Sequence, residues 1–267
     1  MTRINWRDHA PHVSKRNVLV GNLLGPAGGS AATIGAHVLR QLQLVARHVM
    51  QPGQTGDYHV HADQEQIYHF LRGAGKMHVD EEIHPVRAGD LICLPATCYH
   101  QLINDGDDWI EHLLIAGARL PERQRAANAA AIAANGPAGA KLPIACRSWL
   151  AVSPVRSSTG ALFAWRAFAR KAEGAEFIDA PLETVQEVSM QRLHPRHATE
   201  AWSDPRCERV YYVTGGSGEL SAGFAREPMR EGDAIHLPAG TDHSVSNPHD
   251  DWLEYLAIVG VPADPSD

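Results

Sequence analysis

The sequence has few cysteines, few aromatic residues and no long apolar run. Its four cysteines include no pair at the two-residue spacing of common redox and zinc motifs, so free thiols are expected. Nowhere do about eighteen apolar residues follow one another, the length that a membrane-spanning helix needs. The first residues also lack the apolar segment of an export signal. We therefore expect a cytoplasmic protein without a membrane partner.

Basic residues form no dense cluster in the sequence. The chain has a formal net charge of −7, and its 24 lysines and arginines include no run that could follow a phosphate backbone. Nucleic acid is therefore not an expected partner. The remaining composition is that of a globular protein, because 44% of the residues are hydrophobic and 267 residues suffice for two ordinary domains.

One segment of the sequence occurs twice. Residues 89–117, GDLICLPATCYHQLINDGDDWIEHLLIAG, return at 232–260 as GDAIHLPAGTDHSVSNPHDDWLEYLAIVG, with 15 of 29 positions identical. A match of this length indicates two copies of one structural unit. The first half carries a full set of histidines, and the second has lost most of its own.

Short apolar patterns in the first half predict strands separated by turns. Gln41–Met50 alternates between two faces, which is the period of a half-buried strand. Further strands are predicted through Tyr58–His61 and Gln66–Leu71, and another runs from a Gly-rich turn at 73–75 to an acidic turn at 80–82. This succession is typical of an antiparallel sandwich or barrel.

A helix is expected between the two copies. Pro121–Ala134 is rich in alanine, arginine and glutamine, and an Asn-Gly-Pro stop signal follows it. We therefore assign residues 1–118 to an N-terminal unit, 119–148 to a helical linker and 149–267 to a C-terminal unit. Alternatively, the helix packs on one of the two cores, since alanine-rich helices pack well.

Three histidines of the first half predict a metal site. His59 and His61 lie two residues apart on a predicted strand, so both imidazoles leave the same face with β-carbons about 6–7 Å apart. His100 follows a turn at Pro95 on a later strand and supplies a third nitrogen if the sheet curls back on itself. A surface HxH pair is the common alternative, but the surrounding motif favours ligands.

The order and spacing of these residues resemble both signature motifs of the cupin family. The quoted positions are Gly53, His59, His61 and Gly73 for the first motif, and Gly89, Pro95, Thr97, His100 and Asn104 for the second. The second motif returns in the other half with Gly232, Pro238, Gly240, His243 and Asn247 in register. The chain therefore looks like a bicupin. The resemblance implies an all-β fold of two tandem cupin-type β-barrels (double-stranded β-helix or jelly roll), joined by a short helical linker.

The fourth metal ligand is less clear than the three histidines. Cupins usually carry a glutamate here, where this sequence has Gln66 beside Glu65. Neighbouring residues of a strand face opposite ways, and alternation places Gln66 on the inner face with Tyr68 and Phe70. We therefore favour Gln66 over Glu65 as the fourth group near the metal.

The second half departs further from the family pattern. Counted back from Gly215, Glu208 takes the carboxylate position, while Ala201 and Ser203 stand in the two HxH slots. Two ligands, Glu208 and His243, do not normally hold a divalent ion, so we expect the second barrel to be metal-free. His194 and His197 could substitute only through a rearranged loop. The expected role of the second barrel is to pack against the first barrel or against another chain.

Two further residues are candidate catalytic groups. Tyr68 shares the predicted face of Gln66 and could donate a proton to a substrate, and His48 lies on the apolar face of its strand and could act as a base. Core packing with a satisfied hydroxyl or imidazole is the alternative for each. The position of His112 relative to the barrel interior stays open.

Imidazole ligation narrows the choice of ion. Three neutral nitrogens and a neutral amide suit one divalent transition metal per chain, and they exclude a hard-oxygen site for Ca(II) or Mg(II). In cupins with three histidines and no carboxylate, the resemblance favours Fe(II), with Mn, Ni, Zn or Cu as alternatives. An ion without a carboxylate ligand keeps its full charge, which favours an anionic bidentate substrate.

Three functions follow from this resemblance. The first is an Fe(II) dioxygenase acting on a small anionic enol, phenol or diketone. The second is a non-redox lyase or isomerase that uses Zn, Mn or Ni, with Tyr68 or His48 moving a proton. The third is a small-molecule-binding cupin without turnover. In each case the partner is a small molecule, and homo-oligomers could form through the barrels.

Overall fold

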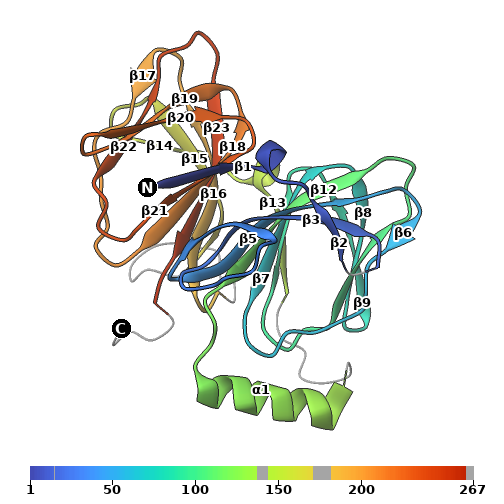
Figure 1. The fold of residues 1–267 in the computed structure, drawn as a ribbon. Coiled ribbons are helices and arrows are strands. Elements are labelled where there is room, and N and C mark those ends of the chain that lie inside the picture. Colours follow the sequence, from blue (N-terminus) through green and yellow to red (C-terminus); the bar gives the residue numbers. More distant parts are fainter. Residues whose placement is uncertain (15, 137–143, 171–181, 263–267) are drawn as a thin grey trace.

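The computed structural model describes residues 1–14, 16–136, 144–170 and 182–262. These residues form two β-barrels that lie side by side, with one α-helix, α1 (Glu122–Asn135), beneath them (Figure 1). The predicted all-β fold of tandem barrels joined by a short helix is thus confirmed. Within the described part of the chain, no helix is long and apolar enough to cross a membrane.

The N-terminal barrel consists of a large and a small sheet. Its strands are β2 (His12–Ser14), β3 (Val18–Pro26), β4 (Ile34–Leu39), β5 (Leu42–Met50), β6 (Gln54–Thr55), β7 (Gln66–Arg72), β8 (Ala74–Val79), β9 (Glu82–Arg87), β10 (Asp90–Leu94), β11 (His100–Asn104) and β12 (Ile110–Gly117). The large sheet has the order β10-β7-β12-β5-β3-β2, with β4 beside β3, and the small sheet has the order β6-β11-β8-β9. Among the described strands of this barrel, β3 and β4 are the only neighbours that pair in parallel, and the others are antiparallel.

The C-terminal barrel repeats this plan. Its strands are β14 (Val155–Arg156), β15 (Leu162–Ala169), β16 (Val185–Leu193), β17 (His197–Ala198), β18 (Glu208–Gly215), β19 (Ser217–Ala222), β20 (Ala225–Arg230), β21 (Asp233–Leu237), β22 (His243–Asn247) and β23 (Leu253–Gly260). The large sheet has the order β21-β18-β23-β16-β15-β14, and the small sheet has the order β17-β22-β19-β20.

The two barrels correspond residue by residue at a constant offset. Strand β5 begins at Leu42 and strand β16 at Val185, an offset of 143, and β12 and β23 end at the same offset, at Gly117 and Gly260. The paired glycines Gly73 and Gly216 have φ of +80° and +73°, and a Cβ on either would collide with the carbonyl oxygen of a tryptophan. This offset extends the repeat well beyond the segment that the sequence alone reveals.

Each barrel borrows a strand from the other half of the chain. Strand β1 (Thr2–Asn5) pairs with β21 of the C-terminal barrel, whereas β13 (Ala145–Ser148) pairs with β10 of the N-terminal barrel. Strand β1, from the predicted N-terminal unit, thus joins the C-terminal sheet, and β13, from the predicted linker, joins the N-terminal sheet. The division at residues 118 and 148 stays a prediction.

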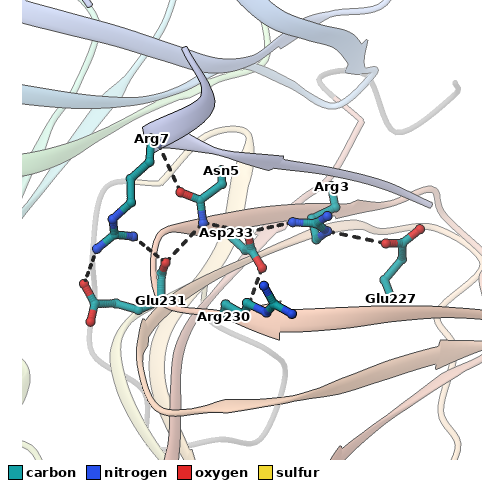
Figure 2. A network of polar contacts seen from close by, with 7 residues as sticks. All are labelled: Arg3, Asn5, Arg7, Glu227, Arg230, Glu231 and Asp233. Carbon is teal, nitrogen blue, oxygen red and sulfur yellow. Dashed lines mark hydrogen bonds and ion pairs between the residues drawn. The ribbon is translucent and has the colours of Figure 1, made fainter. Parts of the chain in front are cut away.

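The borrowed strand β1 is fixed by charged side chains as well as by its backbone (Figure 2). Buried Asp233 accepts hydrogen bonds from Arg3 Nη1 at 3.1 Å and from Asn5 Nδ2 at 2.8 Å. Arg7 reaches the carboxylate of Glu231 at 2.8 Å. These contacts attach the N-terminal arm to the far barrel.

The large sheets of the two barrels pack against each other through a shared core. One cluster of buried residues draws from both halves, including Val45 and Ile115 from the first and Val188 and Ile258 from the second. Two smaller clusters fill the barrel interiors. Strands such as β5 and β7 are therefore buried on both faces, which is why simple alternation describes them incompletely.

The helix matches its predicted range, whereas one predicted strand does not form. The helix begins and ends within one residue of its predicted range, and Gly136 follows it with φ of +56°. The prediction of a strand through Tyr58–His61 is wrong, since only one isolated bridge, between His59 and His100, forms there. The segment from Asp57 onward is an irregular loop whose backbone still meets β11.

Candidate metal centre

Three histidines from two segments meet inside the N-terminal barrel. The nitrogen atoms that His59, His61 and His100 can offer all lie within 4.8 Å of one another. The ring centroids of His59 and His100 are 4.3 Å apart, and those of His59 and His61 are 5.0 Å apart. No other group of three or more such ligands occurs among the described residues. The predicted triad is therefore assembled by the fold.

Backbone hydrogen bonds position two of these imidazoles. The isolated bridge joins His59 N to His100 O at 3.1 Å and His100 N to His59 O at 2.8 Å. Nδ1 of His59 lies 3.0 Å from the carbonyl oxygen of Asp57, and Nδ1 of His100 lies 3.1 Å from that of Cys98. A carbonyl can only accept, so Nδ1 carries the proton in each ring and Nε2 presents a lone pair. This is the tautomer that a metal ligand needs.

Glu65 and Gln66 face opposite ways, as alternation along a strand requires. The Glu65 carboxylate is fully buried between the barrels, where Oε1 accepts hydrogen bonds from the amides of Thr184 and Val185 at 2.6 and 2.8 Å. Gln66 lies on the other face, and its Oε1 accepts a bond from the Tyr68 hydroxyl at 3.4 Å. The assignment of Gln66 as the fourth group near an ion stays a proposal. Glu65 is not available for that role, because its carboxylate binds backbone amides at the interface between the barrels.

Tyr68 and His48 belong to an aromatic group beside the triad. The Tyr68 ring lies 5.9 Å from that of His100 and stacks on His112 at 4.9 Å, and His48 meets His112 edge-on at 5.0 Å. Burial raises the pKa of the Tyr68 hydroxyl, so it stays protonated at neutral pH. The catalytic roles of Tyr68 and His48 stay predictions.

The sequence did not identify His112 as a member of this group. Both ring nitrogens of His112 are buried and have no hydrogen-bond partner among the described residues. Burial, and then the charge of His48, lowers its pKa well below the usual range, so the ring is neutral. Both faces of β12 are buried, so alternation alone could not place this side chain. Its cross-strand partner, His48, was the only available signal.

A small cavity lies next to the triad. Its volume is about 30 Å³, and its polar lining includes His48, His59, Tyr68 and His112. The apolar part of the wall comes from Val18, Met50 and Leu102. A space of this size admits about one water molecule, so a larger ligand requires side chains to move.

The C-terminal barrel carries other residues at the corresponding positions than the sequence predicted. The true counterpart of Gly73 is Gly216, not Gly215, so the register counted from the sequence was one residue off. The bridge between Trp202 and His243 matches that between His59 and His100. Trp202 and Asp204 therefore occupy the two HxH slots, rather than Ala201 and Ser203.

The same shift changes the fourth position of the C-terminal barrel. Leu94 pairs with Gln66 and Leu237 pairs with Arg209, which makes Arg209 the counterpart of Gln66. Glu208 instead corresponds to Glu65, and it too reaches across the interface, to the amides of Arg40 and Gln41 at 3.0 and 2.6 Å. His194 and His197 lie 3.2 Å apart between their Nδ1 atoms, in an exposed position.

The donor set of the N-terminal barrel fits a transition metal. Three imidazoles, two of them with Nε2 as the lone-pair nitrogen, are the ligands that Fe, Mn, Ni, Zn and Cu accept, whereas Ca and Mg require oxygen cages. In the C-terminal barrel the corresponding positions carry an indole, a carboxylate, a guanidinium and one imidazole. Only the first arrangement suits such an ion.

The chain belongs to the cupin family. The family model described as a cupin domain matches residues 46–115 and again residues 189–259, one match in each barrel. These two segments together span more than half of the chain. The resemblance read from the two histidine motifs is confirmed, and the protein is a two-domain cupin.

Similar proteins are known in sequence and in structure. The oxalate-binding protein of Thermotoga maritima is 29% identical over 94 residues, which are 33% of this chain and 78% of that protein. A Pseudomonas aeruginosa protein described as glyoxylate-induced superposes with a TM-score of 0.72 at 13% identity, covering 98% of this chain and 89% of its own. The Lactobacillus farciminis oxalate decarboxylase, in a formate complex, reaches 0.68 at 15% identity, with coverages of 97% and 86%. At these identities the two structures support the fold alone.

Proposed function

We propose that the N-terminal barrel binds one divalent transition metal through His59, His61 and His100 and uses it on a small anionic molecule. The observation that carries this proposal is the convergence of three imidazoles within 4.8 Å. Gln66 supplies a neutral fourth group on the same face. His59 and His100 would bind through Nε2, the nitrogen opposite the one that each ring directs at a backbone carbonyl.

The charges around the site support an anionic ligand. The nearby Glu65 carboxylate is directed away into the interface, and Asp57, which contributes to the cavity wall, pairs with Arg16 at 2.9 Å. An ion held by neutral imidazoles and a neutral amide would keep both positive charges. An anion with two adjacent oxygens would neutralise them at short range.

The first candidate reaction is Fe(II)-dependent dioxygenation of a small anionic enol or diketone. When bound, Fe(II) would supply the activation of O₂ that no side chain of this chain can provide. The apolar wall of Val18, Met50 and Leu102 would exclude water from the ligand.

The second candidate is a non-redox lyase or isomerase reaction. The oxalate decarboxylase and the oxalate-binding protein among the similar proteins favour a compact acid as the ligand. Tyr68 keeps its proton and could donate it at the hydroxyl, while His48 could receive one. The name of the Thermotoga relative also favours a third candidate, ligand binding without turnover.

One set of measurements separates these candidates. Metal content of protein purified without added metal tests the site itself, and about one ion per chain is expected. Anaerobic protein loaded with Fe(II), Mn(II) or Zn(II) is then offered β-diketones, enols, oxalate and other compact acids. O₂ uptake with substrate loss supports the dioxygenase, and turnover under nitrogen supports the lyase or isomerase. Binding by calorimetry without any turnover supports the binding protein. Wild-type protein that binds no transition metal would refute the proposal.

A further inference from the structure

The two barrels carry side chains of different charge and hydrogen-bonding capacity at one corresponding strand position. Gln66 on β7 and Arg209 on β18 hold the same place, each paired with a leucine of the neighbouring strand. The residue two positions further on is a buried tyrosine in both barrels, Tyr68 and Tyr211. An amide oxygen can accept a hydrogen bond, whereas a guanidinium can only donate. The partner of the tyrosine therefore changes its role between the barrels.

In the C-terminal barrel the contacts of His243 determine which group donates in its hydrogen bond with Tyr211. Nδ1 of His243 lies 2.8 Å from the carbonyl oxygen of Thr241, so this nitrogen donates and Nε2 carries the lone pair. The Tyr211 hydroxyl lies 2.9 Å from that Nε2 and must therefore donate to it. The positive charge of Arg209 acts on the same tyrosine, where it opposes the rise in the Tyr211 pKa that burial causes. The histidine lone pair that faces the barrel interior is thus occupied by a hydroxyl proton.

In the N-terminal barrel the tyrosine donates in another direction. The Tyr68 hydroxyl donates to Gln66 Oε1 at 3.4 Å. His100, the counterpart of His243, directs Nδ1 at the carbonyl oxygen of Cys98 in the same way, so its lone pair is also on Nε2. The single hydroxyl proton of Tyr68 is directed to Gln66, and His100 belongs to the triad.

The Arg209 guanidinium also brings a positive charge into the C-terminal site. Its carbon lies 3.9 Å from the centroid of the Trp202 ring, which replaces His59. Its Nε is buried and has no acceptor among the residues that the structure describes. Burial lowers the pKa of His243, and the positive charge of Arg209 lowers it further. A divalent ion placed here would be repelled by this side chain.

We propose that the residue at position 66 or 209 decides whether its barrel can hold a metal ion. Gln66 accepts the tyrosine proton, whereas Arg209 cannot accept it and leaves the tyrosine to donate to the last histidine. Arg209 also places a fixed positive charge beside Trp202, the counterpart of His59. The C-terminal barrel therefore carries an internal guanidinium in place of a metal. The part concerning the N-terminal barrel rests on the proposed function, and the part concerning Arg209 does not.

The first test builds a histidine triad in the C-terminal barrel. Trp202→His with Asp204→His supplies the two missing imidazoles beside His243, with Arg209 retained. A second protein adds Arg209→Gln. We expect Co(II) and Zn(II) titrations to give one ion per chain for the double variant and two for the triple variant. The proposal would be overturned if the double variant bound a second ion. It would also be overturned if the triple variant folded but bound no second ion.

The second test makes the reverse change in the N-terminal barrel. Gln66→Arg is expected to reduce metal content from about one ion per chain to near zero, while Gln66→Glu, which keeps an acceptor for Tyr68, retains the ion. Circular dichroism and thermal melting confirm that both variants fold. Full metal content in Gln66→Arg would contradict the role assigned to this position. The two proposals fail separately: the metal content of the wild type reports on the proposed function, and the difference between the double and triple variants reports on Arg209.

Discussion

The two barrels share one scaffold and differ in what points into it. At three positions where the N-terminal barrel directs His59, His61 and His100 inward, the C-terminal barrel has Trp202, Asp204 and His243. Most strand bounds correspond at the offset of 143 residues. The backbone plan therefore depends on residues outside the site, and one copy keeps its fold with only one of the three histidines.

The largest expected contrast is in metal content. His100→Ala should remove the bound ion, from about one per chain to near zero, because two imidazoles leave a divalent ion mostly hydrated. His243→Ala, the same change at the corresponding position, should leave metal content unchanged. Inductively coupled plasma analysis of both purified variants makes the comparison. The opposite pattern would show that the metal belongs to the other barrel.

A second contrast concerns the two interfacial glutamates. The Glu65 carboxylate accepts four hydrogen bonds, from the amides of residues 183, 184 and 185 and from the Thr184 hydroxyl. Gln at this position offers one acceptor oxygen and leaves buried amides without partners. Glu65→Gln should therefore lower the free energy of unfolding by about 2–4 kcal/mol.

Glu208→Gln tests the reciprocal contact and should have a similar effect, since Glu208 accepts from two amides and lies 3.0 Å from Nε2 of His236. The control is Glu122→Gln on the exposed start of α1, which should change the free energy of unfolding by less than about 0.5 kcal/mol. Urea unfolding of all three variants provides the values. Equal effects of Glu65→Gln and Glu122→Gln would show that the interfacial bonds do not stabilise the pair of barrels.

A third contrast is the response to acid. His69 faces the core between the barrels, where the C-terminal copy has Tyr212, and burial lowers its pKa from 6.5 to about 4. The unfolded chain therefore binds this proton more readily than the folded chain. Protonation of His69 therefore does not affect the free energy of unfolding above pH 6.5. As the pH falls from 6.5 to 4, the free energy of unfolding decreases by about 3 kcal/mol.

His69→Leu should make the free energy of unfolding less dependent on pH between 6.5 and 4. The exposed control, His249→Gln, should keep the pH dependence of the wild type. Urea midpoints measured at several pH values for the wild type and both variants give the slopes. If His69→Leu keeps the slope of the wild type, the acid sensitivity originates elsewhere.

The sequence predicted what is encoded locally and missed what depends on distant partners. The spacing of His59, His61 and His100 sufficed because cupin turns fix where those residues meet, and alternation placed Gln66 and Tyr68 on one face. The register of the second half failed because the count started from Gly215 instead of the adjacent Gly216. The offset of 143 residues in the repeated segment already indicated Gly216, and the backbone contacts agree with it. The interfacial roles of Glu65 and Glu208 could not be foreseen, since their partners lie more than 100 residues away.

The smallest expected contrast tests the charge of the N-terminal site. Gln66→Glu keeps the acceptor for Tyr68 and adds one negative charge beside the ion, so metal content should stay the same or rise. The reduced net charge should weaken the binding of a small bidentate anion about tenfold, or about 1.4 kcal/mol. Anaerobic calorimetry with Co(II)-loaded protein and oxalate or a β-diketonate measures this. Gln124→Glu on the exposed side of α1 makes the same chemical change far from the site and should leave the affinity unchanged. If both variants bind the anion as the wild type does, Gln66 lies outside the field of the ion, and the neutral character of its amide has no part in ligand choice.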